Sequence, residues 1–174
     1  MHVRSAIVVT AGFILGSVLT PALFGQAANP MQGTLAHIAF VVHDVDKTAA
    51  AFGNVFGVPA PPAVVARNVA FPPSYGGATM NAKYTLVSAN GVEFEFVEPL
   101  DGQSPWKDFL EKHGEGVQNI AFNVPNAAEA RMFLESKGGK WTQAIRPTMA
   151  YVDMAPKLPI TFEVIGPRPA PPAK

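Results

Sequence analysis

Four polar side chains that could bind a metal ion lie in segments with the apolar, alternating pattern of β-strands: His37, Glu95, Asn119 and Glu163. In each segment the polar residue lies on the face opposite the large apolar side chains, because successive residues of a strand point to opposite faces. A buried carboxylate is costly unless a cation or hydrogen bonds compensate its charge. An imidazole, two carboxylates and an amide oxygen form a donor set that could hold a divalent metal ion.

Two of these residues occupy the same place in an internal repeat. Residues 35–42 read Leu-Ala-His-Ile-Ala-Phe-Val-Val and residues 117–124 read Val-Gln-Asn-Ile-Ala-Phe-Asn-Val, so Ile-Ala-Phe follows both His37 and Asn119. A helical segment that runs into glycine follows each copy. The repeat indicates two copies of one structural unit. It also favours the metal site, because His37 and Asn119 fall in equivalent strands.

The hydrophobic periodicity predicts the elements that must position these side chains. Strands are expected at residues 35–42, 64–69, 83–88, 92–97, 117–124, 141–146, 149–154 and 159–165, and helices at 45–56, 105–112 and 126–137. If the helices pack on the large apolar faces, the four polar residues share the concave face of a sheet. Residues 71–77 are rich in Pro and Gly, and we expect them to form a loop that covers this face.

Each of the four residues also has a purely structural explanation. A single histidine in a strand is more often a hydrogen-bonded structural residue than a ligand. Glu93 and Glu95 could both face solvent on an antiparallel sheet, and Asn119 could satisfy a neighbouring backbone group. Glu163, in an otherwise apolar last strand, is the hardest to explain in this way.

The composition excludes several classes of partner and site. The formal net charge is zero and no basic stripe is present, so nothing indicates a nucleic-acid partner. The chain has no cysteine, which excludes disulfide bonds and cysteine-based metal sites.

Residues 1–27 have the pattern of a secretory signal peptide. Arg4 gives a positively charged start, residues 6–24 are almost wholly apolar, and Gly25 and Ala27 are small residues where a signal peptidase would cut. The alternative is an uncleaved anchor helix, which would be the only membrane contact. With either reading we expect the globular part to be secreted or periplasmic in a bacterium.

The chain resembles the vicinal oxygen chelate superfamily, which includes glyoxalase I, bleomycin-resistance proteins and extradiol dioxygenases, and within it the methylmalonyl-CoA epimerase-like branch. The similarity rests on Ala-His-Ile-Ala-Phe at 36–40, Glu-Phe-Val-Glu-Pro-Leu at 95–100, the run at 104–117 and Ile-Ala-Phe-Asn-Val at 120–124. It implies an α+β fold: two tandem βαβββ modules that form a cupped mixed β-sheet with helices on the outer face.

The resemblance and the signal peptide together imply a domain organisation. A linker at 28–33 precedes a single domain at 34–167, and a disordered tail follows at 168–174. Within the domain, module one covers 34–100, a connecting helix covers 104–113 and module two covers 117–167. Members of the superfamily often pair their modules between chains, so a homodimer is compatible with the resemblance.

The resemblance also implies the role of each site residue. It places the ligands of a divalent metal ion at His37, Glu95, Asn119 and Glu163, with Glu163 as the catalytic base, and implies no other cofactor. The family usually has histidine where this chain has Asn119, and an amide shifts the preference toward harder ions such as manganese, magnesium or calcium.

A second departure concerns the epimerase reaction. The related mechanism uses two glutamate bases on opposite faces of an enolate, but residues 47–92 contain no Asp or Glu. Tyr75 or Lys83 could replace the missing base only with a strongly shifted pKa. Coenzyme A thioesters are also not expected outside the cytoplasm. We therefore do not expect methylmalonyl-CoA epimerase activity.

Two functions follow from these observations. The first is an exported, metal-dependent isomerase or lyase that acts on a small oxo- or hydroxy-acid through an enolate. The alternative is a non-catalytic, bleomycin-resistance-like protein that binds a small molecule in the cup. An extradiol dioxygenase needs two histidines and a carboxylate on its iron, and Asn119 argues against that reading.

Overall fold

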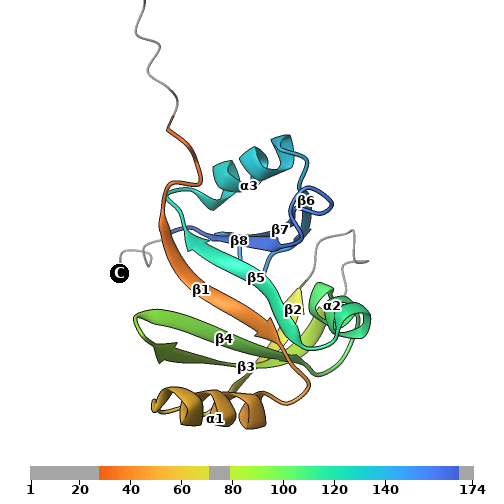
Figure 1. Cartoon of the computed structure of the whole chain (residues 1–174). Coiled ribbons are helices and arrows are strands. Elements are labelled where there is room, and N and C mark those ends of the chain that lie inside the picture. The colour runs from red at the N-terminus through yellow and green to blue at the C-terminus, as the bar shows by residue number, and fades with distance from the viewer. Residues whose placement is uncertain (1–27, 71–78, 169–174) are drawn as a thin grey trace, which may run out of the picture.

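In the part of the chain that the structure describes, eight strands form one mixed sheet, with two helices on its outer face and a third between the two halves of the sheet (Figure 1). The computed structural model describes residues 28–70 and 79–168. The elements are β1 (Thr34–Val41), α1 (Val45–Phe56), β2 (Val64–Ala70), β3 (Thr79–Ala89), β4 (Val92–Pro99), α2 (Pro105–His113), β5 (Gly116–Asn123), α3 (Ala127–Ser136), β6 (Lys140–Gln143), β7 (Met149–Asp153) and β8 (Thr161–Ile165).

The order of the strands reveals the two modules. It reads β2-β3-β4-β1-β5-β8-β7-β6, so the second half of the sheet mirrors the first about the β1–β5 pair. Within each module the first strand pairs in parallel with the last, β1 with β4 and β5 with β8, while β1 and β5 pair antiparallel. The predicted fold of two βαβββ modules in a cupped mixed sheet is therefore confirmed.

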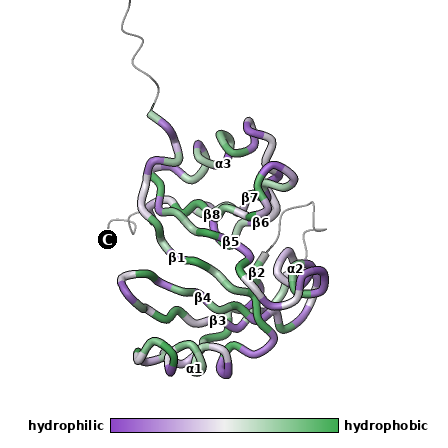
Figure 2. Tube along the Cα trace, in the orientation of Figure 1, coloured by the Kyte–Doolittle hydropathy of each residue, from purple (hydrophilic) through white to green (hydrophobic). Residues whose placement is uncertain are grey.

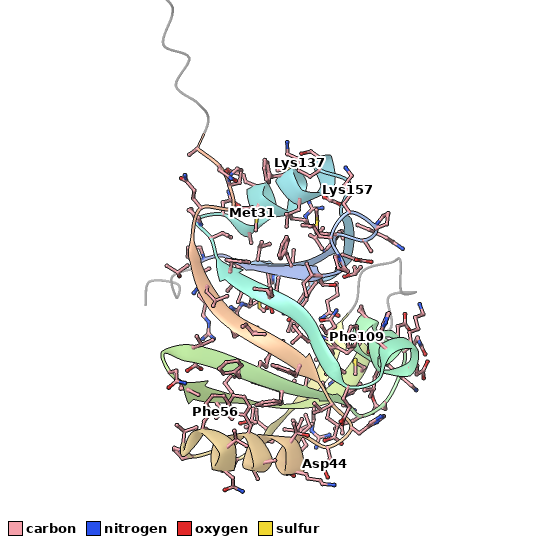
Figure 3. The ribbon with its side chains drawn as sticks, viewed as in Figure 1. Met31, Asp44, Phe56, Phe109, Lys137 and Lys157 are labelled. Atoms are coloured by element: carbon pink, nitrogen blue, oxygen red, sulfur yellow. The ribbon has the colours of Figure 1, made fainter. Side chains whose placement is uncertain are left out.

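Equivalent caps start the helices of the two modules. The side chain of Asp44 accepts a hydrogen bond from the backbone of Lys47 at 3.0 Å, which satisfies one of the free N–H groups at the start of α1. The side chain of Asn126 accepts the equivalent backbone hydrogen bonds at the start of α3. Gly57 caps the end of helix α1, and its φ of 65° lies in the left-handed region that glycine adopts without strain. Figure 3 marks the two ends of this helix by Asp44 and Phe56.

The outer face of each module carries its own apolar core. Under α1 the rings of Phe40, Phe52 and Phe96 stack or meet edge to edge. Under α3 the fully buried side chains are mainly aliphatic and include Leu134 and Val164, and aromatic side chains such as Phe162 pack against them. Figure 2 shows hydrophobic residues along the central strands and hydrophilic residues on the side of α2 that points away from the sheet. These two cores hold the outer face, so the polar residues of the same strands face the concave side.

Helix α2 differs from the other two helices because it packs over one end of the concave face. Trp106 lies in a cluster with Val41, Val97 and Tyr151, and its ring meets that of Tyr151 edge to edge with centroids 6.1 Å apart. The cup is therefore apolar at the end that α2 covers.

Two strands, β3 and β6, have an end that lies three or more residues from its expected position. β3 begins at Thr79, four residues before the expected start, because β2 pairs with it along its first half. β6 ends at Gln143 and not at 146, and the chain turns through residues that include Pro147, which cannot donate a strand hydrogen bond. The expected signal peptide and the expected loop at 71–77 lie outside the described residues. Within the described ranges, no helix is long and apolar enough to cross a membrane.

Replacing Phe96 tests the outer core of module one. Phe96 is buried on β4, next in sequence to Glu95. We expect Phe96→Ala to lower the free energy of unfolding by about 3–5 kcal/mol, because it leaves a cavity among the stacked rings. Val55→Ala is the control, since Val55 is 80% exposed on α1 and should change stability by less than about 0.5 kcal/mol. Equal urea midpoints for the two variants would contradict this core.

Candidate metal centre

Two alanines on β1 and β5 make room for the polar side chains. Ala39 pairs with Glu95 on one side and with Asn119 on the other. Ala121 likewise pairs with His37 on one side and with Glu163 on the other. Directly paired residues point to the same face of a sheet, so larger side chains meet above each alanine. This explains the repeated Ile-Ala-Phe sequence: the alanine two residues after the polar residue leaves space on the concave face.

The four predicted site residues come together on that face. Nε2 of His37 lies 3.0 Å from Oε2 of Glu163 and 3.2 Å from Oε2 of Glu95. One ligand atom from each of these three residues falls within 4.8 Å of the others. Glu163 is completely buried and His37 is 8% exposed. Glu95 is the partly exposed member and marks the side that faces solvent.

Asn119 reaches the same centre with its amide nitrogen and not its oxygen. Nδ2 of Asn119 donates a hydrogen bond to Oε2 of Glu163 at 3.1 Å. A metal ligand must be the amide oxygen, so Asn119 would join a metal centre only with its amide turned over. In the arrangement seen here it holds the carboxylate of Glu163 in place.

Burial and charge shift the pKa values of this cluster. Burial alone would lower the pKa of His37, but the hydrogen bonds and charges of Glu163 and Glu95 outweigh it and raise the pKa to about 10. Burial raises the pKa of Glu163, the hydrogen bond from His37 acts against this, and repulsion from Glu95 adds to it. The protonated imidazole of His37 is thus the positive charge that compensates the two carboxylates.

The donors present fit a divalent cation. Oε1 of Glu163 is buried and makes no hydrogen bond of normal geometry to any described residue, whereas buried carboxylate oxygens are normally bonded. A cation among His37, Glu95 and Glu163 would take over the compensating charge and give this oxygen a partner. One imidazole and two carboxylates suit zinc, manganese and similar ions.

Of the two residues considered as replacements for the missing second base, Lys83 does not reach the centre. Lys83 forms a salt bridge with Asp46 of α1, which lies on the outer side of the sheet, and this partner raises the pKa of the Lys83 amine. Tyr75 lies outside the described residues. Glu93 accepts a hydrogen bond from Ser88.

Three polar residues near the centre were not foreseen. Tyr151 on β7 pairs with Glu163 in the sheet. Burial, the charges of Glu163 and Glu95, and a hydrogen bond to the Glu163 carboxylate raise the pKa of the Tyr151 hydroxyl well above the usual value. Gln143 pairs with Tyr151 and is completely buried. Gln118 immediately precedes Asn119. The equivalent position of module one holds the small residue Ala36, and this difference between the two copies of the repeat is the sequence feature that points to Gln118.

Two open pockets flank the second module. The larger, about 490 Å³, lies on the outer side beside α3 and includes Arg131 and Trp141. The other, about 400 Å³, lies between α2 and the strands, and its floor includes Gln118 and Thr161. Gln118 and Thr161 neighbour Asn119 and Glu163 on the same strands, but the lining of the pocket includes none of the four residues of the metal centre.

Comparison with known proteins identifies the family. A sequence model of the glyoxalase/bleomycin resistance protein/dioxygenase superfamily matches residues 36–155. The chain belongs to this superfamily. Human mitochondrial methylmalonyl-CoA epimerase is 30% identical over 106 residues, which cover 60% of this chain and 54% of the human protein. The chain thus spans about half of the length of that relative.

Solved structures of this superfamily share the fold. Methylmalonyl-CoA epimerase from Mycobacterium tuberculosis has a TM-score of 0.58 at 19% identity, and the match covers 85% of this chain and 96% of that one. A variant of Streptomyces coelicolor methylmalonyl-CoA epimerase, in complex with 2-nitronate-propionyl-CoA, has a TM-score of 0.55 at 17% identity, with 77% and 96% covered. These superfamily members establish how the chain folds, while their identities are too low to transfer an activity.

The raised pKa of His37 predicts how the stability of the metal-free protein depends on pH. The folded pKa lies above the unfolded value, so protonated His37 stabilises the fold fully below pH 6.5, and the contribution is lost as the pH rises through about 10. The raised pKa of Glu163 acts in the same direction. With EDTA present, the urea midpoint should fall across this range. His37→Gln should flatten the curve, and an unchanged slope in this variant would contradict the charge assignment.

Proposed function

We propose that the protein is an exported, metal-dependent isomerase or lyase that acts on a small oxo- or hydroxy-acid. In this proposal Glu163 moves a proton at the carbon next to the carbonyl group of the substrate. The proposal rests on the buried centre, on the family of the chain and, for export, on the sequence pattern of residues 1–27.

The main support for this proposal is the difference in surroundings between the two carboxylate oxygens of Glu163. Oε2 is held by His37 and Asn119, whereas Oε1 makes no hydrogen bond of normal geometry within the described residues. The hydroxyl of Tyr151 interacts with the Glu163 carboxylate and is the neighbouring donor. A general base needs a free oxygen within reach of the substrate and a pKa near the working pH. Complete burial raises the pKa of Glu163 in that direction. The fixed oxygen would orient the carboxylate, and the free one would accept the proton.

His37, Glu95 and Glu163 would hold the metal ion. A divalent cation there supplies positive charge beside the carbonyl oxygen of the substrate and thereby favours the loss of the neighbouring proton. The partly exposed side of Glu95 offers the approach for the substrate, and Asn119 keeps the carboxylate of Glu163 in position.

The centre favours a reaction with a single base. Residues 47–92 supply no carboxylate, and Lys83 is engaged by Asp46 on the outer side of the sheet. A base on one side can remove a proton and return it to the same face, or can start the elimination of a leaving group. It cannot serve both faces of an enolate, so the two-base epimerisation of a thioester is the less favoured reaction.

A binding protein without catalysis is the second candidate. Its support is the apolar end of the cup, where Val41, Val97 and Trp106 form one cluster under α2, together with the amide of Asn119 in place of an imidazole. Such a protein would hold its ligand by apolar contacts and would not exchange its protons.

Deuterium exchange separates the two candidates. In D₂O with Mn²⁺, we expect the protein to replace the C3 protons of 2-oxobutyrate by deuterium, as followed by NMR. Glu163→Gln should slow the exchange by at least about 100-fold, because it removes the base. Glu135→Gln is the matched control, since Glu135 pairs with Arg131 at the outer surface of α3. Binding of the acid without exchange in the wild-type protein would favour the binding protein, and exchange that survives in Glu163→Gln would exclude Glu163 as the base.

A further inference from the structure

The larger of the two pockets carries charge of one sign only. It lies between α3, β6 and the turn that joins β6 to β7, and its volume of about 490 Å³ falls in the range of sites for small organic molecules. Among the described residues that line it, the only charged ones are Arg131 and Arg146, and the others are Trp141, four alanines, Ile145, Pro147 and Met149. No residue of the candidate metal centre belongs to this lining, so the pocket is a separate site.

Arg146 is half-buried in this pocket and has no acidic partner. Its Nε donates a hydrogen bond to Oγ1 of Thr148 at 3.3 Å, and no salt bridge joins it to a described residue, although every Asp and Glu of the chain is described. Its charge also acts on the hydroxyl of Tyr151, but the pKa of that hydroxyl is raised well above the usual value and the group stays neutral. A half-buried charge without a counterion is unfavourable, so Arg146 is suited to bind an anion.

Arg131 is already compensated by a carboxylate. Its NH1 donates a hydrogen bond to Oε2 of Glu135 at 2.8 Å, and its guanidinium carbon lies 4.7 Å from the centre of the Trp141 ring. A guanidinium has five N–H groups, so Arg131 keeps donors for a second partner while its charge is balanced. The pocket therefore contains one uncompensated positive charge, that of Arg146, and matches a ligand with a single negative charge.

The uncharged part of the lining determines the rest of the ligand. Nε1 of Trp141 donates a hydrogen bond to the backbone oxygen of Gln143, so the indole offers the pocket an apolar surface. Ile145 is 40% exposed and would gain burial against an apolar ligand. A carboxylate with an apolar body suits these surroundings, whereas a phosphate ester carries more negative charge than Arg146 balances.

We propose that the pocket between α3 and the β6–β7 turn binds an organic monocarboxylate with a compact apolar body. The terminal nitrogens of Arg146 hold the carboxylate by two parallel hydrogen bonds, which is the arrangement that a guanidinium favours. Trp141 and Ile145 contact the apolar body. This site goes beyond the proposed function, because it needs no metal ion and does not include Glu163.

Three ligands separate the contribution of the charge from that of the apolar body. The full chain, freed of metal ions by dialysis, is titrated with 3-phenylpropanoate, with the neutral 3-phenylpropanamide and with propanoate, and the NMR signal of the Trp141 indole N–H gives each dissociation constant. We expect 3-phenylpropanoate to bind at least about tenfold more tightly than the amide, which lacks the charge, and than propanoate, which lacks the ring. The indole signal of Trp106, which packs under α2, should not move.

Variants of the two arginines test the anion contact. Arg146→Gln should weaken the binding of 3-phenylpropanoate at least about tenfold and leave that of the amide unchanged. Arg67→Gln is the matched control, since it removes one positive charge at an exposed position of β2, and should leave every affinity unchanged. If Arg146→Gln does not fold, Arg146→Lys replaces it. This variant keeps the charge but loses the paired hydrogen bonds, and should weaken the binding of the carboxylate about threefold or more.

Several results would overturn this site. They are equal affinities for the carboxylate and the amide, an affinity that survives unchanged in the Arg146 variant, and a shift of the Trp106 signal in place of the Trp141 signal. Phenyl phosphate that binds as tightly as 3-phenylpropanoate would overturn the assignment of a single negative charge. The exchange experiment on Glu163 enters none of these outcomes, so the two proposals succeed or fail separately.

Discussion

The charge of Glu163 at the centre of the sheet is the constraint on which the rest of the structure depends. A carboxylate without solvent exposure is stable only with compensating partners. His37 and Asn119 supply them from two neighbouring strands, and Ala39 and Ala121 leave the space in which the side chains meet. The cores on the outer face pack these strands against α1 and α3 and so fix the positions from which the site residues project.

The two modules share a plan but have diverged on the concave face. Module one presents an apolar surface around Val41 and Val97, which α2 covers. Module two presents Gln118, Tyr151 and Gln143, which are buried and polar. The repeat therefore preserves the positions of the candidate metal centre, while the second copy carries additional buried polar groups. The two sides of the concave face therefore differ in their chemistry, since the side formed by module one is apolar and the side formed by module two is polar.

Much of this arrangement could be predicted from the sequence. The alternation of apolar and polar residues shows which side chains share a face of a strand, and the internal repeat shows which strands are equivalent. Once four strands are aligned by Ile-Ala-Phe and by their apolar faces, His37, Glu95 and Glu163 must share one side. Bulges could not be predicted in this way: they add one residue to a strand, and this shift turned Gln118 toward the cup. The side to which Lys83 points became clear only from its pairing with Asp46. The amide orientation of Asn119 depends on a hydrogen bond that sequence does not reveal.

With a pKa of about 10, His37 is protonated at neutral pH. It must lose that proton to become a metal ligand, so a divalent ion should bind in exchange for a proton. The most direct measurement is calorimetric titration of Mn²⁺ at constant pH in two buffers of different protonation enthalpy. We expect about one ion bound per chain and about one proton released per ion, and both should be lost in His37→Gln. Absence of binding, or binding that releases no proton and persists in this variant, would contradict it.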